Sequence, residues 1–340
     1  MTLITYPTRV HFADHVLEEA LQSELERVQC HRLLLTCDRS VAATEMMDRV
    51  MSGIPGRIKV KVVTFGEDTY LRGIAQELAD PASPHDTIVA FGSARAVELG
   101  RKCRYAKATR GRERPELFAI PAVDGLPNPC RRNLESTRAG LPSVLICDPT
   151  VTLSAAPDAS YRASVLAVIR CVESYLAQSY NPPADGMALD GLTRCVESLP
   201  HIADETGIDI HREVMAACLN AALSQEKGIG PAQALSEALV GEDAGTDQVS
   251  IARLVLPGVM RVRSMDHAKA DVLRKVLGDT AAPLDVVTER LLSRAPLPGS
   301  LSDLGVSRGA LDPAAEAAAG VAGLTFDQAR DILDAVYEDA

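Results

Sequence analysis

The feature that most constrains this chain is a change of pattern near Pro157. Before it, short apolar runs are separated by stretches with helical spacing. One such run, Val144–Cys147, stops abruptly at Asp148 and Pro149, which is typical of a buried strand. After it, from Ala163 to Tyr175 and on to the C-terminus, apolar residues recur at helical spacing. The pattern predicts two halves of different architecture, with a ligand cleft between them.

The first half alternates predicted strands with predicted helices. The other strands are expected at Arg9–Phe12 (an edge strand), Leu33–Asp38, Ile58–Phe65, Thr87–Gly92 and Leu117–Pro121. The helices are expected at His15–Arg27, Val41–Met51, Tyr70–Leu78 and Ala94–Lys102. This alternation predicts a Rossmann-like α/β domain over residues 1–158, with a doubly wound, mainly parallel sheet. In such a sheet, ligands bind at the carboxyl ends of the strands.

The second half, residues 159–340, is predicted to be an all-α domain. Pro182 and Pro183 are expected to separate one helix from the next, because proline cannot continue a helix from its interior. The later helices are expected at Asp185–Leu199, Glu213–Gln225, Gln233–Val240, Val249–Val262, Ala268–Val276, Leu284–Leu292, Pro313–Ala319 and Phe326–Tyr337.

Charge and cysteine content exclude several classes of protein. The 46 acidic residues exceed the 35 basic ones, for a net charge of −11, which argues against binding nucleic acid or an anionic membrane. There is no apolar run long enough for a membrane span, and the N-terminus does not have the pattern of a signal peptide. The 8 cysteines contain no Cys-x-x-Cys pair and are expected to be buried thiols. We therefore expect a soluble cytoplasmic protein.

The strand-to-helix turn at Gly92, Ser93 and Arg95 is a candidate phosphate site. A glycine allows close backbone approach, and a helix N-terminus favours an anion. Arg95 adds positive charge, but it also fills the space that glycine leaves open. An ordinary β–α turn is the competing interpretation.

A basic run over residues 101–114 stands out in this acidic chain. It is either a solvated segment or a docking site for an acidic protein partner or an anionic substrate. Arg131 and Arg132 form a second basic pair that would favour an anion. The seven residues of the run are Arg101, Lys102, Arg104, Lys107, Arg110, Arg112 and Arg114.

Short motifs in a fixed order resemble the iron-type alcohol dehydrogenase superfamily, which has the dehydroquinate synthase-like fold, and within it the maleylacetate reductases most closely. Each motif is short, and their shared order across nearly the whole chain carries the resemblance. They are Arg9-Val10-x-Phe12, Ile88-Val89-Ala90-Phe91-Gly92, Ala119-Ile120-Pro121, Asp148-Pro149-x-x-Thr152-Leu153, Cys171-Val172-Glu173 before Tyr175, Ala234-Leu235-Ser236 before Leu239, Val255-Leu256-Pro257, and Leu304-Gly305-Val306 with Ala310-Leu311-Asp312.

The resemblance implies where a divalent metal would bind, and those positions have lost their ligands. The family uses an Asp and a His four residues apart, followed by two further His. The corresponding residues here are Leu166, Arg170, Gln233 and Gln248, and an additional family His corresponds to Glu237. Leucine cannot ligate, arginine repels a cation, and a glutamine carbonyl is a weak ligand for a transition metal. No metal is expected, and maleylacetate reductases are thought to work without one.

The resemblance also implies an NAD(P)H site in the first domain. The family's Gly-Gly-Gly-Ser turn corresponds to Gly92-Ser93-Ala94-Arg95, and its Pro-Thr-Thr turn to Pro121-Ala122-Val123. Two added Cβ atoms and an arginine at a backbone–phosphate approach argue sterically against ordinary dinucleotide binding.

Three functional hypotheses follow. The first is a metal-independent NAD(P)H reductase of a small anionic carbonyl substrate, with Arg170 as a fixed cation, Gln233 and Gln248 beside it, and Glu237 as proton donor. The second is a cofactor-free enzyme for acid–base elimination, isomerisation or cyclisation in the same pocket. The third is a non-catalytic partner protein. An Arg170–Glu237 ion pair that closes the former metal site is the structural alternative for these residues. The resemblance also implies a homodimer.

Overall fold

The computed structural model describes residues 8–66, 69–78, 85–109, 115–122, 142–204, 207–240, 247–320 and 323–338. The chain divides into two compact units. The α/β unit takes in Thr5–Ala156 and Gly207–Met215, and the helical unit takes in Pro157–Thr206 and Ala216–Ala340.

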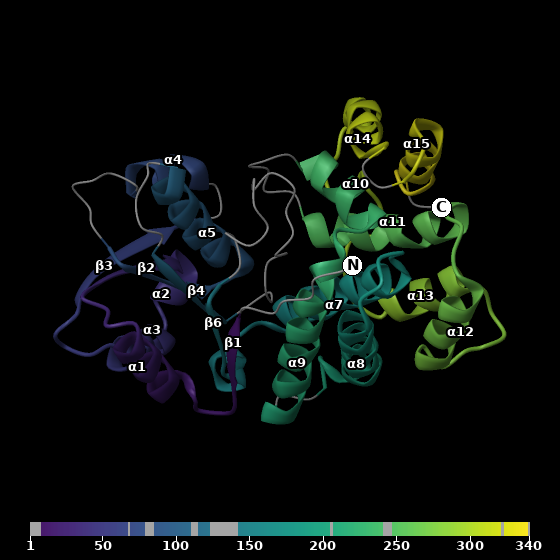
Figure 1. Ribbon diagram of the computed structural model, residues 1–340. Coiled ribbons are helices and arrows are strands. Elements are labelled where there is room, and N and C mark those ends of the chain that lie inside the picture. Colours follow the sequence, from purple (N-terminus) through teal and green to yellow (C-terminus); the bar gives the residue numbers. More distant parts are fainter. Residues whose placement is uncertain are drawn as a thin grey trace. The chain divides into compact units, whose positions relative to one another are not determined.

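A parallel sheet forms the centre of the α/β unit (Figure 1). Its strand order is β1-β6-β5-β4-β2-β3, and every adjacent pair is parallel. The inner strands are almost continuously apolar because helices cover both of their faces. The strands are β1 (Arg9–Phe12), β2 (Arg32–Asp38), β3 (Lys59–Phe65), β4 (Thr87–Gly92), β5 (Glu116–Pro121) and β6 (Val144–Cys147).

Helices lie on both faces of this sheet. Figure 1 shows α4 and α5 on one face and α1 and α3 on the other, which is the doubly wound arrangement. The predicted α/β fold with a parallel sheet is confirmed. The helices are α1 (Leu17–Arg27), α2 (Arg39–Ala42), α3 (Glu45–Ser52), α4 (Leu71–Leu78) and α5 (Ala94–Thr109).

The strand order reverses at β2. From β2 the chain moves outward to β3 at one edge, and it then returns to β4 on the other side of β2 and continues to β5 and β6. The carboxyl ends of β2 and β4, at Asp38 and Gly92, therefore flank the topological switch point of the sheet. In open α/β sheets this is the place where ligands bind.

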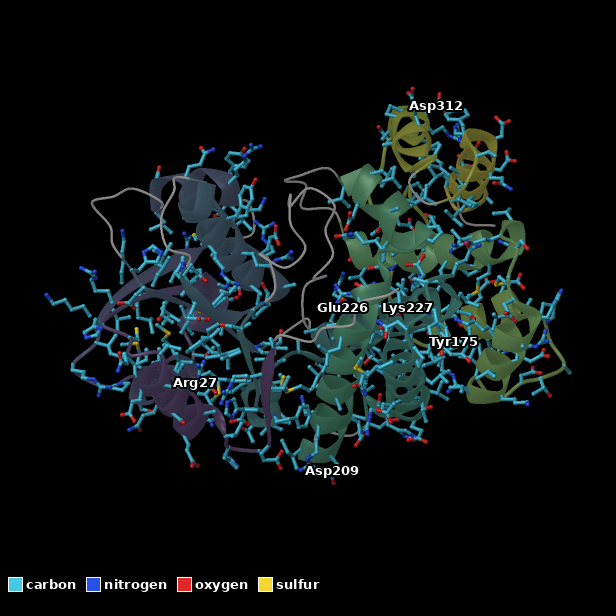
Figure 2. The ribbon with its side chains drawn as sticks, viewed as in Figure 1. Arg27, Tyr175, Asp209, Glu226, Lys227 and Asp312 are labelled. Carbon is cyan, nitrogen blue, oxygen red and sulfur yellow. The ribbon has the colours of Figure 1, made fainter. Side chains whose placement is uncertain are left out.

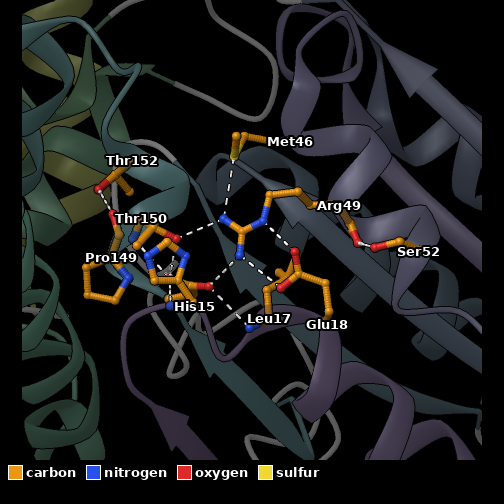
Figure 3. A network of polar contacts seen from close by, with 10 residues as sticks. His15, Leu17, Glu18, Met46, Arg49, Ser52, Pro149, Thr150 and Thr152 are labelled. Atoms are coloured by element: carbon orange, nitrogen blue, oxygen red, sulfur yellow. Dashed lines mark hydrogen bonds and ion pairs between the residues drawn. The ribbon is translucent and has the colours of Figure 1, made fainter.

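Asp148 directly follows β6, at the same carboxyl edge of the parallel sheet as Asp38 and Gly92. It belongs to a polar network whose other members, among them Arg49 and Thr150, are labelled in Figure 3. Its side chain has no exposed surface and accepts hydrogen bonds from the backbone N–H groups of His15 and Leu17, from the backbone and hydroxyl of Thr150, and from Arg49 Nη2. Burial opposes ionisation of Asp148, but these hydrogen bonds outweigh it and hold its pKa below the ordinary value. The motif that begins at Asp148 is therefore a structural junction of α1, α3 and the turn after β6.

The helical unit follows. Its helices agree with the predicted all-α half, although several begin earlier than expected. They are α7 (Pro157–Leu176), α8 (Pro182–Ser198), the later part of α9 (Ile208–Ser224), α10 (Pro231–Val240), α11 (Gln248–Val262), α12 (His267–Val276), α13 (Leu284–Leu292), α14 (Leu311–Ala318) and α15 (Phe326–Ala335).

A buried lysine joins several of these helices. Lys227, labelled with Tyr175 in Figure 2, has no exposed side-chain surface and donates to Asp185 Oδ1 at 2.5 Å. Lys269 shares the Asp185 carboxylate and also donates to the Tyr175 carbonyl at the end of α7. Burial lowers the pKa of Lys227. This cluster connects the end of α7 with α8 and α12.

Three local expectations have definite outcomes. Pro182 and Pro183 begin α8 instead of merely separating two helices, because proline is tolerated in the first turn, and Asn181 Oδ1 caps that turn at Ala184 N. The helix predicted to end near Lys102 continues to Thr109. The cysteines of the described residues are buried free thiols, as expected. In the part of the chain that the structure describes, no helix is long and apolar enough to cross a bilayer.

Candidate functional site

The positions implied for a metal lie on three helices of the helical unit. Leu166 and Arg170 are one turn apart on α7, so they lie on the same face of that helix. Arg170 is 5% exposed, whereas Leu166 is half-buried. Gln233 and Glu237 are one turn apart on α10, and Gln248 is the first residue of α11. Gln233 is buried, and Glu237 and Gln248 are half-buried.

A direct contact joins α7 to α10. The Glu173 carboxylate accepts the Ala232 backbone N–H at 2.6 Å and the Gln233 side-chain Nε2–H at 2.9 Å. Glu173 lies three residues after Arg170, so the face of α7 that carries Arg170 is turned toward the start of α10. In the sequence, Glu173 is only a landmark of the resemblance. The available signal was a single carboxylate inside an otherwise apolar stretch of the helix.

A second contact joins α10 to α11. Gln248 Nε2 donates to Ser236 Oγ at 3.4 Å, and Ser236 Oγ donates to the Gln233 backbone carbonyl at 2.8 Å. Asp247 caps α11 and forms an ion pair with Arg162 of α7. These hydrogen bonds link the Gln248 side chain, through Ser236, to the backbone of Gln233. An Arg170–Glu237 pair stays a prediction.

These residues do not fit a divalent metal. The four positions supply a hydrocarbon, a permanent cation and two neutral amides, and none of these is a good ligand for iron or zinc. A buried guanidinium would also repel a metal cation at that place. Within the described residues, no group of three or more His, Cys, Asp or Glu side chains is placed to hold a metal ion.

The candidate nucleotide turn lies at the switch point of the α/β unit. Gly92 has φ +127, which is strained for any residue with a side chain, and a Cβ built there would lie 2.2 Å from Asp38 Oδ2. The Asp38 carboxylate accepts the Ser93 backbone N–H and the Ser93 hydroxyl, each at 2.7 Å. Glycine is therefore required for the end of β4 to approach the end of β2.

Hydrogen bonds to backbone carbonyl groups fix the residues around this turn. Arg95 Nη2 donates to the Thr69 carbonyl at 3.0 Å, which connects α5 to the segment after β3. Pro121 pairs with Gly92 in the sheet register, and the Ala122 N–H donates to the Gly92 carbonyl at 2.9 Å. Gly92, Ser93, Arg95 and Pro121 thus lie at one turn of the α/β unit, and a cofactor site there stays a prediction.

The turn fits the adenosine half of a dinucleotide in two respects. It lies at the switch point, and a carboxylate stands at the end of β2, where an acidic residue in such folds accepts the ribose hydroxyls. The Asp38 contact with Ser93 was missed from the sequence, because the two residues are 55 positions apart and neither forms a motif with the other.

The basic segment lies only partly within the described residues. Arg101 is 1% exposed and forms an ion pair with Glu98 one turn earlier on α5. The part of the run that includes Arg101 is therefore helical rather than a solvated loop. Arg110, Arg112 and Arg114 lie outside the described residues, as do Arg131 and Arg132.

Comparison with known proteins gives one relative by sequence and several by structure. No model of a known protein family matches the chain. A 4-hydroxybutyrate dehydrogenase of Cupriavidus necator is 26% identical over 356 residues, covering 92% of this chain and 92% of that protein. An iron-containing alcohol dehydrogenase of Thermococcus thioreducens has a TM-score of 0.83 at 14% identity, covering 98% of this chain and 99% of that chain.

Two further solved structures are similar over the whole length. A maleylacetate reductase of Agrobacterium tumefaciens has a TM-score of 0.74 at 20% identity, covering 99% of this chain and 97% of that chain. A sulfoacetaldehyde reductase of Bifidobacterium kashiwanohense, in complex with NAD+, has a TM-score of 0.80 at 15% identity, covering 100% of both chains. The predicted resemblance is confirmed, because the chain has the fold of the iron-type alcohol dehydrogenases and maleylacetate reductases.

Proposed function

We propose that the chain is a metal-independent oxidoreductase that transfers a hydride between a nicotinamide dinucleotide and a small anionic carbonyl or hydroxy compound. The observation that carries this proposal is the buried Arg170 on α7, at a position where the resemblance implies a metal ligand. The sequence relative named 4-hydroxybutyrate dehydrogenase supports the same class of reaction.

Each unit supplies part of what this reaction needs. In the α/β unit, Asp38 would accept the ribose hydroxyls of the cofactor, at the turn where Gly92 lets the end of β4 approach the end of β2. A bound nicotinamide supplies or accepts the hydride.

In the helical unit, Arg170 would hold a carboxylate or polarise a carbonyl oxygen, because a guanidinium is a permanent charge with several donors. Gln233 and Gln248 would orient the substrate, and Glu237 would exchange the proton. Arginine thus takes the electrostatic role of a metal without needing a ligand set.

A second candidate is a cofactor-free acid–base enzyme that uses the same helical-unit residues. It is favoured by the contact of the Asp38 carboxylate with the Ser93 N–H at the N-terminus of α5. A negative charge at that place opposes a pyrophosphate, which would need the same helix end. A measurement of nucleotide binding distinguishes the two candidates, because only the oxidoreductase requires it.

Substitution of Arg170 tests the proposed function. Arg170→Lys keeps the charge but loses the bidentate geometry, and Arg170→Met removes the charge at similar volume. We expect Arg170→Met to lower kcat/KM for oxidation of 4-hydroxybutyrate with NAD+ by roughly a hundredfold or more, and Arg170→Lys to lower it less. Arg290→Met, an exposed arginine on α13, is the matched control. Full activity of a folded Arg170→Met variant would exclude the assigned role.

A further inference from the structure

A small pocket lies in the helical unit between the end of α7, the start of α10 and the end of α11. Its walls are mostly apolar and buried. The space between them, counted together with its open mouth, is about 250 Å³, below the roughly 300 Å³ at which pockets for drug-sized ligands begin. The pocket therefore fits only a small molecule. Its apolar walls include Val172 on α7, Pro231 on α10, and Leu256, Val259 and Met260 on α11.

Two charged side chains also line this pocket, and the first is Glu173. It is 4% exposed, and its place depends on Gly230, because a Cβ built there would lie 2.2 Å from Glu173 Cδ. Burial raises the pKa of Glu173 to about 7, although the Ala232 N–H donates to its Oε1 at 2.6 Å. Near neutral pH, part of the protein therefore has a neutral carboxyl group at the pocket, which can donate a hydrogen bond.

The second charged side chain is Arg263, which directly follows α11 and is half-buried. Its guanidinium forms no hydrogen bond or ion pair with another described residue, and it acts on Glu173 through its charge. Arg261, two residues earlier, is exposed and lies 3.9 Å from an Asp285 oxygen. The Arg263 guanidinium thus has donors available for a ligand, and a carboxylate matches them with two parallel hydrogen bonds.

The charges of the pocket favour an anion over a cation. When Glu173 is ionised, its charge and that of Arg263 cancel, and when Glu173 is protonated, the single positive charge of Arg263 is left. An anion has Arg263 as a partner in both states, whereas a cation has a partner only in the first. The apolar part of such an anion would leave water for the walls of the pocket, which is favourable.

We propose that this pocket is a second ligand site, which binds a small monocarboxylate with a short apolar chain. The carboxylate pairs with Arg263, and the chain packs against Val172, Leu256 and Val259. This inference goes beyond the proposed function, because Arg170 and the three residues assigned with it to the substrate are not among the described residues that line the pocket.

Methionine methyl groups can report on this pocket directly, because Met260 and Met265 line it. The full chain, isotope-labelled at its methionine methyl groups, is titrated with butyrate at about pH 6 and followed by NMR. Met260→Leu and Met265→Leu assign the two resonances. Both should shift and saturate at millimolar butyrate, while those of Met46 and Met51 in α3 should not move. Butyramide, a neutral molecule of the same shape, should bind roughly tenfold or more weakly.

Substitutions then identify the partner of the carboxylate. Arg263→Gln should raise the Kd for butyrate roughly tenfold or more, and Arg261→Gln, at the exposed arginine nearby, should leave it unchanged. Butyrate bound at Arg170 instead would respond to Arg170→Met but not to Arg263→Gln, and this result would overturn the proposal. Equal binding of butyramide, or no shift of the Met260 and Met265 resonances, would overturn it as well. Because no activity is measured, failure of the proposed oxidoreductase would leave a positive result intact.

Discussion

At the scale of single residues, Asp148 shows how one buried carboxylate holds several segments of the α/β unit together. It accepts bonds from two backbone groups at the start of α1, from Thr150 and from Arg49, and Arg49 in turn binds Glu18. Removing the Asp148 carboxylate would leave these donors without an acceptor. Each buried donor that lacks a partner lowers the free energy of unfolding.

The first prediction concerns stability. Asp148→Ala should lower the free energy of unfolding by about 3–5 kcal/mol, and Asp148→Asn should lower it less, because an amide oxygen still accepts some of the bonds. Urea unfolding measures both. Asp209→Ala, at an exposed aspartate, is the control. A loss below about 1 kcal/mol in Asp148→Ala would contradict the assigned role.

Asp38 carries the second prediction, which concerns the choice of cofactor. A carboxylate at the end of β2 accepts ribose hydroxyls but repels the 2′-phosphate of NADPH. NADH should therefore bind at least about tenfold more tightly than NADPH, and Asp38→Asn should narrow the difference. Asp48→Asn, an exposed aspartate in α3, should leave the ratio unchanged. Equal affinities of the wild type for NADH and NADPH would show that Asp38 does not contact the ribose of the cofactor.

At the scale of elements, the connection between α7 and α10 depends on the protonation of Glu173. Burial raises the Glu173 pKa from 4.5 to about 7, and the hydrogen bonds from Gln233 and Ala232 only partly offset it. The folded protein therefore binds a proton that the unfolded chain has already lost between these two pH values.

The third prediction follows from the sign of this linkage. The contribution of Glu173 to stability is fully present below pH 4.5, falls as pH rises to about 7, and is constant above it. The change is on the order of 3 kcal/mol. Urea midpoints measured between about pH 5 and about pH 8 should fall less in Glu173→Gln than in wild type. If the urea midpoints of wild type and Glu173→Gln changed with pH in parallel, the raised pKa of Glu173 would be contradicted.

Elements also show why part of the structure could be predicted from the sequence. The strands could be predicted because buried parallel strands are continuous apolar runs. The start of α15 could be predicted from its helical apolar spacing, and the structure adds a capping box of Thr325 and Gln328 at that start. The end of α5 was placed too early because the basic residues after Lys102 suggested a solvated segment, whereas the helix continues and Cys103 is fully buried.

At the scale of the whole molecule, the sequence predicted the fold but not the contacts that the candidate site residues make. The fold follows from the order of strands and helices, and the loss of metal ligands from residue identity alone. The contacts of Glu173 with Gln233 and of Asp38 with Ser93 join residues 60 and 55 positions apart. Only tertiary packing brings such pairs together, so no local pattern reveals them.

The assembly of the molecule stays a prediction. The resemblance implies a homodimer, and the basic segment 101–114 is either a solvated segment or a docking site for an acidic partner or an anionic substrate. Size-exclusion chromatography with light scattering measures the first directly. A monomeric mass at the concentration of the activity assay would contradict the predicted homodimer.

The most direct test of the central claim is a calorimetric titration of NADH into the purified protein in the presence of EDTA, repeated after adding iron or zinc. We predict binding in the micromolar range that EDTA does not weaken and added metal does not strengthen. Such a result would show that the turn at Asp38 and Gly92 holds a nucleotide in a protein without a metal centre. Failure to bind NADH, or binding only when metal is added, would contradict the proposed metal-independent oxidoreductase.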